Sequence, residues 1–131
     1  MIVVDASAVV EYLLGSPLGQ DVREHIAPSS ARVATPALLD IEVAQAVRGC
    51  YLGGLLEEAR ANKSIEHLAN LNVARWPNAP LLPRVWSLRH NFTAYDAAYV
   101  ALAESLDATL LTCDAALADN PAAGCNVQLV R

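Results

Sequence analysis

The sequence predicts an α/β domain built around a mainly parallel β-sheet. Short apolar runs of strand length alternate along the chain with longer segments of helical periodicity. Gly and Pro residues stand at most of the boundaries between these segments. The 131 residues, 54% of them hydrophobic, suffice for one domain, residues 1–131, with a sizeable core.

The first half of the chain begins with a β-branched apolar run, which we expect to be a buried strand. Gly15 should end the helix that follows, and Pro28-Ser29-Ser30 should end the next one. Pro36 is expected to open a third helix, which Gly53-Gly54 closes. In order, the predicted elements are a strand at 2–4, helices at 6–14 and 18–27, a strand at 32–35 and a helix at 37–52.

The second half repeats the alternation of helices and strands. Pro77 and Pro80 mark a connection after a strand, and a polar loop at 90–93 separates two helices. In order, the predicted elements are a helix at 55–71, a strand at 72–76, helices at 81–89 and 94–106, a strand at 109–112, a helical turn at 114–118 and a strand at 127–130.

Composition excludes several classes of protein. Acidic side chains punctuate every apolar stretch and the first 14 residues lack a basic segment, so we expect a soluble, cytoplasmic protein without a membrane span or signal peptide. The net charge of −5 gives no broad basic surface for nucleic acid. Cys50, Cys113 and Cys125 form no C-x-x-C pair, which argues against a zinc ribbon or a disulfide framework.

Ligands of parallel sheets collect outside the carboxyl ends of the strands, and four acidic residues, at two strand ends, one helix start and one apolar helix face, are candidates for such a site. Asp5 and Asp114 follow two predicted strands, and Asp96 forms a T-x-x-D capping box with Thr93. Each of these three acids has an alternative role as a helix cap. Glu42 falls in an apolar sector of its helix, so it needs a cation or a basic partner.

Carboxylates that meet at one edge of a sheet raise one another's pKa unless a cation compensates. Oxygen ligands select a hard ion such as Mg²⁺ or Mn²⁺, which can activate water against a phosphodiester. The residues alone therefore indicate an acidic metal site.

Four segments resemble the PIN-domain ribonucleases, and in particular the VapC toxins of bacterial VapBC toxin–antitoxin pairs. They are residues 2–8 (IVVDASA), 39–43 (LDIEV), 88–103 (LRHNFTAYDAAYVALA) and 110–114 (LLTCD). The resemblance implies an α/β/α sandwich and a Mg²⁺- or Mn²⁺-dependent endoribonuclease. It also implies an RNA substrate, a VapB-type antitoxin and a homodimer.

The resemblance assigns the catalytic quartet to Asp5, Glu42, Asp96 and Asp114. It implies that Asp5 and Asp96 bind the metal directly, while Glu42 and Asp114 complete the site through water or a second ion. Ser7 and Thr112 match hydroxyl residues of the family and are expected to position the substrate. Arg84 and Arg89 are expected to help position it, because they, like His90, could reach RNA phosphate.

Other readings remain open. A haloacid-dehalogenase-like enzyme needs a second Asp where this chain has Ser7, and a receiver domain needs a Lys near the last strand, whereas the only lysine is Lys63. A non-catalytic PIN-like module that binds RNA or protein is the main alternative, and a plain dimerisation domain is the simplest one.

Overall fold

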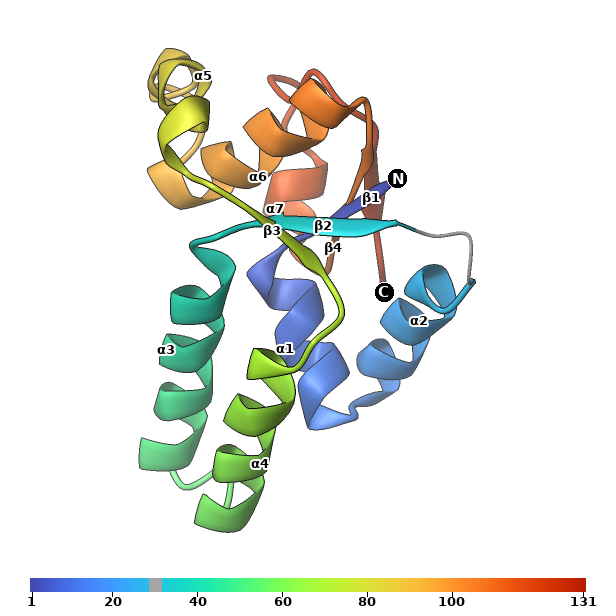
Figure 1. Cartoon of the computed structure of the whole chain (residues 1–131), viewed down its shortest axis with the longest axis vertical. Coiled ribbons are helices and arrows are strands. Elements are labelled where there is room, and N and C mark those ends of the chain that lie inside the picture. Colours follow the sequence, from blue (N-terminus) through green and yellow to red (C-terminus); the bar gives the residue numbers. More distant parts are fainter. Residues whose placement is uncertain (29–31) are drawn as a thin grey trace.

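The computed structural model describes residues 1–28 and 32–131, which fold around one parallel sheet (Figure 1). The strand order is β3-β2-β1-β4-β5, and every neighbouring pair is parallel. The strands are β1 (Ile2–Val4), β2 (Val33–Pro36), β3 (Ala74–Trp76), β4 (Thr109–Thr112) and β5 (Val127–Leu129). The predicted mainly parallel α/β fold is confirmed.

Helices cover both faces of the sheet, as an α/β/α sandwich requires (Figure 1). The helix α6 (Ala94–Leu106) packs on β1, β2 and β4 and carries α5 (Leu82–Ser87) on its outer side. The helices that pack with one another on the other side are α1 (Ala6–Leu14), α2 (Pro17–Ile26), α3 (Leu39–Leu52) and α4 (Glu58–Ala69). The short α7 (Ala115–Ala118) follows β4 and contacts β5.

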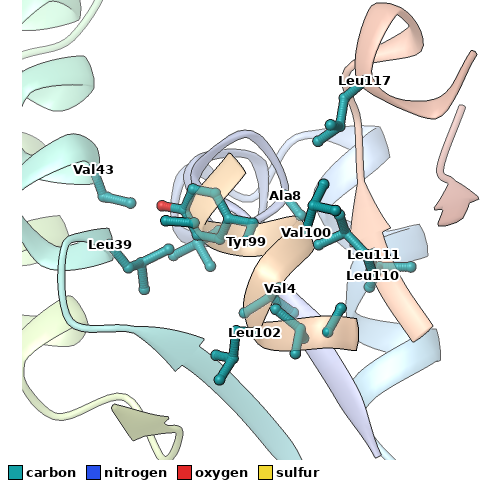
Figure 2. Packing of buried hydrophobic residues seen from close by; sticks show 14 of the residues in the cluster. Val4, Ala8, Leu39, Val43, Tyr99, Val100, Leu102, Leu110, Leu111 and Leu117 are labelled. Atoms are coloured by element: carbon teal, nitrogen blue, oxygen red, sulfur yellow. The ribbon is translucent and has the colours of Figure 1, made fainter. Parts of the chain in front are cut away.

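The core extends over both faces of the sheet, and α6 contributes a continuous buried stretch to it (Figure 2). Residues 97–103 of α6 are all buried, because this helix is apolar on every side. Val4 of β1 and Leu110 of β4 are buried as well, as expected for strands of a parallel sheet that is covered on both faces. This packing fixes the start of α6 relative to the carboxyl ends of the strands.

The prediction that Pro36 opens a helix is wrong. Pro36 is the last residue of β2. It pairs with Trp76 of β3, and the N–H of Ala37 continues this pairing with a 2.7 Å bond to the Trp76 carbonyl. Pro36 has no N–H to offer Val4 on its other side, and the hydroxyl of Thr35 donates to the Val4 carbonyl at 3.1 Å. The helix α3 therefore begins at Leu39 rather than at residue 37.

Other boundaries differ by a few residues. The predicted helix at 81–89 is a 3₁₀ turn (Ala79–Leu81) followed by the short α5, and α4 begins at Glu58 rather than residue 55. The helix end expected at Pro28-Ser29-Ser30 is described only as far as Pro28, because the two serines lie outside the described residues. The three cysteines are free thiols of intermediate burial. Within the described ranges, no helix has the length and apolar character needed to cross a membrane.

Candidate active site

Asp5 directly follows β1 and caps α1. Its Oδ1 accepts hydrogen bonds from the Ala8 N–H at 3.0 Å and from the Ser7 hydroxyl at 2.7 Å, and its Oδ2 accepts one from the Thr112 hydroxyl. The residue is only 4% exposed. Burial raises the pKa of Asp5, and the charge of Asp114 raises it further, against the three hydrogen bonds that favour the carboxylate.

Ser7 and Thr112 hold this carboxylate in place. Each hydroxyl donates its single proton to Asp5 and accepts a backbone N–H in return, from Cys113 at 2.9 Å for Ser7 and from Asp114 at 3.0 Å for Thr112. They thereby tie the ends of β1 and β4 together. The structure thus places both predicted substrate-positioning hydroxyls against Asp5, and their contact with substrate stays a prediction.

Asp114 follows β4 as Asp5 follows β1, and it is the N-cap of α7. Its Oδ1 accepts from the backbone N–H groups of Ala116 at 2.9 Å and Leu117 at 3.4 Å. The capping role that the sequence offered as an alternative is therefore real. It leaves Oδ2 of the same carboxylate free of these two bonds.

Asp96 lies in the first turn of α6, at the end of the helix nearest the strand ends. The Thr93 hydroxyl accepts the Asp96 N–H at 3.1 Å, which is the first half of the predicted capping box. Burial raises the pKa of Asp96, and the charges of Asp114 and Asp5 raise it further, against a hydrogen bond with the Thr93 side chain that lowers it. Asp5 and Asp114 follow the paired strands β1 and β4, so the two lie at the same edge of the sheet, and their charges act on Asp96.

Glu42 contributes the fourth carboxylate, from α3. Burial raises its pKa, and the charge of Asp96 adds to the effect. Its partner is a hydroxyl rather than the cation or base we had expected: Tyr99 of α6 donates to Glu42 Oε1 at 2.7 Å. Tyr99 is 1% exposed, and its ring packs in the core beside Leu39 and Val43 (Figure 2).

Tyr99 was missed as a site residue in the sequence. Its own pKa is raised by burial first, then by the hydrogen bond to Glu42 and by the charges of Glu42, Asp5 and Asp96. The available signal was its position three residues after Asp96, on the same side of the helix. A buried tyrosine also needs a partner for its hydroxyl.

The four acids suit a hard divalent ion through their oxygen donors and crowded charge. Asp5 already accepts three hydrogen bonds, so about one of its roughly four lone-pair sites remains, on Oδ2. Among the described residues, no group of three or more His, Cys, Asp or Glu side chains is arranged to hold a metal ion. Binding of an ion by Asp5 and Asp96, with water as the remaining ligands, which is common for Mg²⁺, therefore stays a prediction.

The two predicted phosphate-binding arginines have protein partners. Arg84 makes a two-pronged contact with Glu104, at 2.7 and 2.9 Å, and Glu104 also accepts the Gly124 N–H. Arg89 lies over the ring of Trp86 at 4.9 Å, and it donates to the Trp86 carbonyl. Their contact with RNA stays a prediction, as does that of His90.

Comparison with known proteins identifies the family. The sequence model of the PIN domain matches residues 2–122. Ribonuclease VapC1 of Mycobacterium tuberculosis is 43% identical over 130 residues, covering 98% of this chain and 97% of the relative. The crystal structure of PAE2754 from Pyrobaculum aerophilum has a TM-score of 0.71 at 22% identity, covering 96% of this chain and 82% of the other.

A toxin–antitoxin complex from Klebsiella pneumoniae also has this fold, with a TM-score of 0.66 at 14% identity and coverage of 100% and 98% of the two chains. The likeness to VapC1 extends over nearly the whole of both chains, and the model match includes all four acids of the site. The chain belongs to the PIN domain family and, within it, to the VapC ribonucleases.

Proposed function

We propose that this chain is the toxin of a toxin–antitoxin pair, an endoribonuclease that hydrolyses RNA in the cytoplasm with Mg²⁺ or Mn²⁺. The observation that carries the proposal is that Asp5 and Asp114 follow the paired strands β1 and β4, that their charges act on Asp96, and that the charge of Asp96 acts on Glu42. The relatives named Ribonuclease VapC support RNA as the substrate.

Each acid has a distinct task in this proposal. Asp5 and Asp96 would hold the ion, and Ser7 and Thr112 fix the Asp5 carboxylate for this task. Glu42, oriented by Tyr99, and Asp114 would accept hydrogen bonds from water molecules bound in the site. When bound, the ion lowers the pKa of a water molecule and stabilises the charge that develops on the phosphodiester.

The test is a cleavage assay on RNA with purified protein. Cleavage should require Mg²⁺ or Mn²⁺ and stop in EDTA, and the products should carry 5′-phosphate and 3′-hydroxyl ends. Cleavage that persists in EDTA, or products with a 2′,3′-cyclic phosphate, would contradict the mechanism. RNA binding without any cleavage, indifferent to added metal, would instead favour the non-catalytic module.

The antitoxin is the second proposed partner. A cluster of carboxylates in a chain of net charge −5 attracts a cationic side chain, and an Arg or Lys of the antitoxin bound there would compete with the ion. At a fixed antitoxin concentration, raising Mg²⁺ should therefore restore cleavage. Inhibition that is indifferent to both metal and salt would indicate that the antitoxin blocks the site by apolar contacts alone.

The family resemblance also supports a homodimer. The exposed apolar side chains of Leu82 and Trp86 on α5 are available for such a contact. Sedimentation velocity on the purified chain tests it, and a single monomeric species at micromolar concentration would contradict it.

A further inference from the structure

A pocket of about 390 Å³ opens beside the acidic site. One wall is α3 with the residue that precedes it, and the other is the start of α6. The residues that line it are Leu38, Ile41, Glu42, Gln45 and Tyr95. Glu42 belongs to this pocket and to the acid quartet, so the two are continuous.

The spacing of these residues explains the shape of the pocket. The four from the α3 side follow one another at intervals of three, one and three positions, which places them on one face of the helix. Tyr95 directly precedes Asp96 in the first turn of α6. A ligand in the pocket would thus lie next to whatever group the acids hold.

The lining combines an aromatic ring, aliphatic side chains and one amide. Tyr95 is 62% exposed and Ile41 is 76% exposed, so neither side chain contributes much to the core. Gln45 offers both hydrogen-bond donors and an acceptor. A flat molecule with apolar faces and a polar edge suits such a site, and an unstacked nucleobase has this form.

Electrostatics also favour a base over a phosphate in this pocket. Its one acidic wall residue, Glu42, is a carboxylate that repels phosphate. Two of the chain's arginines are already paired with acids, Arg84 with Glu104 and Arg75 with Asp40. RNA bound to a chain of net charge −5 gains from contacts that do not depend on charge, and base stacking supplies them.

We propose that this pocket binds one nucleobase of the RNA, next to the phosphodiester that is cut, with the base stacked on the ring of Tyr95 and its polar edge toward Gln45. The proposal rests on the proposed endoribonuclease function. It makes Tyr95 a substrate-binding residue and Gln45 a residue that discriminates between bases.

The first experiment compares variants on a pool of hairpin RNAs with randomised single-stranded loops, with the cuts read by sequencing. Tyr95→Ala should lower kcat/KM about 5- to 150-fold, the range that loss of one base–aromatic stack spans. Tyr95→Phe keeps the ring and should cut like the unaltered chain. Gln45→Ala should change which base is preferred beside the cut. Leu55→Ala removes an exposed apolar side chain remote from the pocket and serves as the control.

The second experiment removes the base instead of the ring. Hairpins cut by the unaltered chain are made with an abasic ribose at each position flanking the cut. At the position that occupies the pocket, the abasic RNA should be cut equally well by the unaltered chain and by Tyr95→Ala, because the stack is absent in both cases. A variant that had merely displaced Asp96 would stay slower on the abasic RNA as well.

Two results overturn the inference and leave the nuclease function intact. One is metal-dependent cleavage with the same rate and base preference in Tyr95→Ala as in the unaltered chain. The other is a change of oligomeric state in Tyr95→Ala, by sedimentation velocity, which would assign the pocket to a second copy of the chain. Absence of cleavage of any RNA by the unaltered chain with Mg²⁺ or Mn²⁺ would instead overturn the proposed function, and this inference with it.

Discussion

Asp5 and Asp96 differ in how much of the fold depends on them. Asp5 accepts three hydrogen bonds and caps α1, whereas the α6 cap is formed by the Thr93 side chain and the backbone N–H of Asp96. Asp96→Asn therefore leaves the backbone hydrogen bond of this cap in place, and the amide oxygen can still accept a hydrogen bond from Thr93. This difference separates catalytic from structural effects at the two positions.

We predict that Asp96→Asn abolishes cleavage and leaves the free energy of unfolding of the metal-free protein unchanged or higher. The raised pKa of Asp96 means that its surroundings disfavour the charge, in spite of the helix dipole. Glu58→Gln, in the first turn of α4, is the matched control and should cost about 0.3–1 kcal/mol. Asp5→Asn should also abolish cleavage. Its NH₂ group would face the hydroxyl of either Thr112 or Ser7 in place of an acceptor oxygen, which should lower the free energy of unfolding by about 1–3 kcal/mol. Urea unfolding in EDTA measures the changes in the free energy of unfolding, and the cleavage assay measures activity. A large destabilisation by Asp96→Asn would contradict the prediction for this residue.

A second prediction concerns Tyr99. Tyr99→Phe removes the 2.7 Å hydrogen bond to Glu42 and leaves a half-buried carboxylate without this donor. We expect a loss of about 1–3 kcal/mol in the free energy of unfolding and a lower rate of cleavage. Because the Tyr99 hydroxyl holds the pKa of Glu42 down, the acidic limb of the rate profile should also move to higher pH. Tyr51→Phe on α3, at a more exposed tyrosine, should change neither quantity.

These residues show what a sequence reveals about such a site. Asp5, Asp96 and Asp114 were singled out because each follows a strand or opens a helix, where local patterns indicate position and direction, and Glu42 because it falls in an apolar sector of its helix. Tyr99 and Glu42 are 57 positions apart, and Thr112 and Asp5 are 107 apart. Which hydroxyl meets which carboxylate depends on the packing of α3, α6 and β4, and this information is not local.

At the scale of elements, the close approach of α1 and α2 depends on Gly19. A Cβ atom at this position would lie 2.1 Å from the Glu11 carbonyl oxygen, which belongs to the backbone of α1 and cannot move aside. Gly19→Ala should therefore push the two helices apart and destabilise the protein by about 1–3 kcal/mol or more. Gly49→Ala, within α3, meets nothing within 4 Å and should stabilise it by about 0.4–1 kcal/mol. Thermal unfolding of both variants checks the opposite signs, and equal effects would contradict the packing argument.

Element boundaries were predicted well where a local signal decides them. Gly15, in the left-handed conformation, ends α1 where expected, and α6 has the predicted bounds. Pro36 is compatible with a helix start, but pairing with Trp76 across the sheet made it the end of a strand. Sheet pairing competes with local preference, and a single sequence does not show its outcome.

At the scale of the molecule, the crowding of acids stores electrostatic repulsion at one edge of the sheet. The pKa values of Asp5, Glu42 and Asp96 are all raised by burial and by neighbouring acids. The folded, metal-free protein therefore holds protons more strongly at these positions than the unfolded chain. The folded protein is therefore less stable at neutral pH with these carboxylates charged than when a proton or a cation neutralises them.

The last prediction follows from that linkage. The three raised pKa values lie above the unfolded values of 3.8 for Asp and 4.5 for Glu, so the metal-free protein should gain stability as the pH falls from neutral through the folded-state values. Glu104, whose pKa is lowered by Arg84, acts in the opposite sense, and its contribution is lost below about its unfolded value of 4.5. Stability in EDTA should therefore be greatest on the acidic side of neutrality and above that value. Saturating Mg²⁺ should stabilise the protein most at pH values where the carboxylates are ionised, and progressively less as protons compete for them. With Mg²⁺, stability should therefore rise with pH, whereas in EDTA it should fall from mildly acidic to alkaline pH. Urea unfolding at about pH 5 and about pH 8, each with EDTA or with MgCl₂, gives the four free energies of unfolding that this comparison needs. Both pH values lie close to the range where proteins are usually most stable. Parallel pH profiles with and without the ion would mean that Mg²⁺ does not bind to these carboxylates.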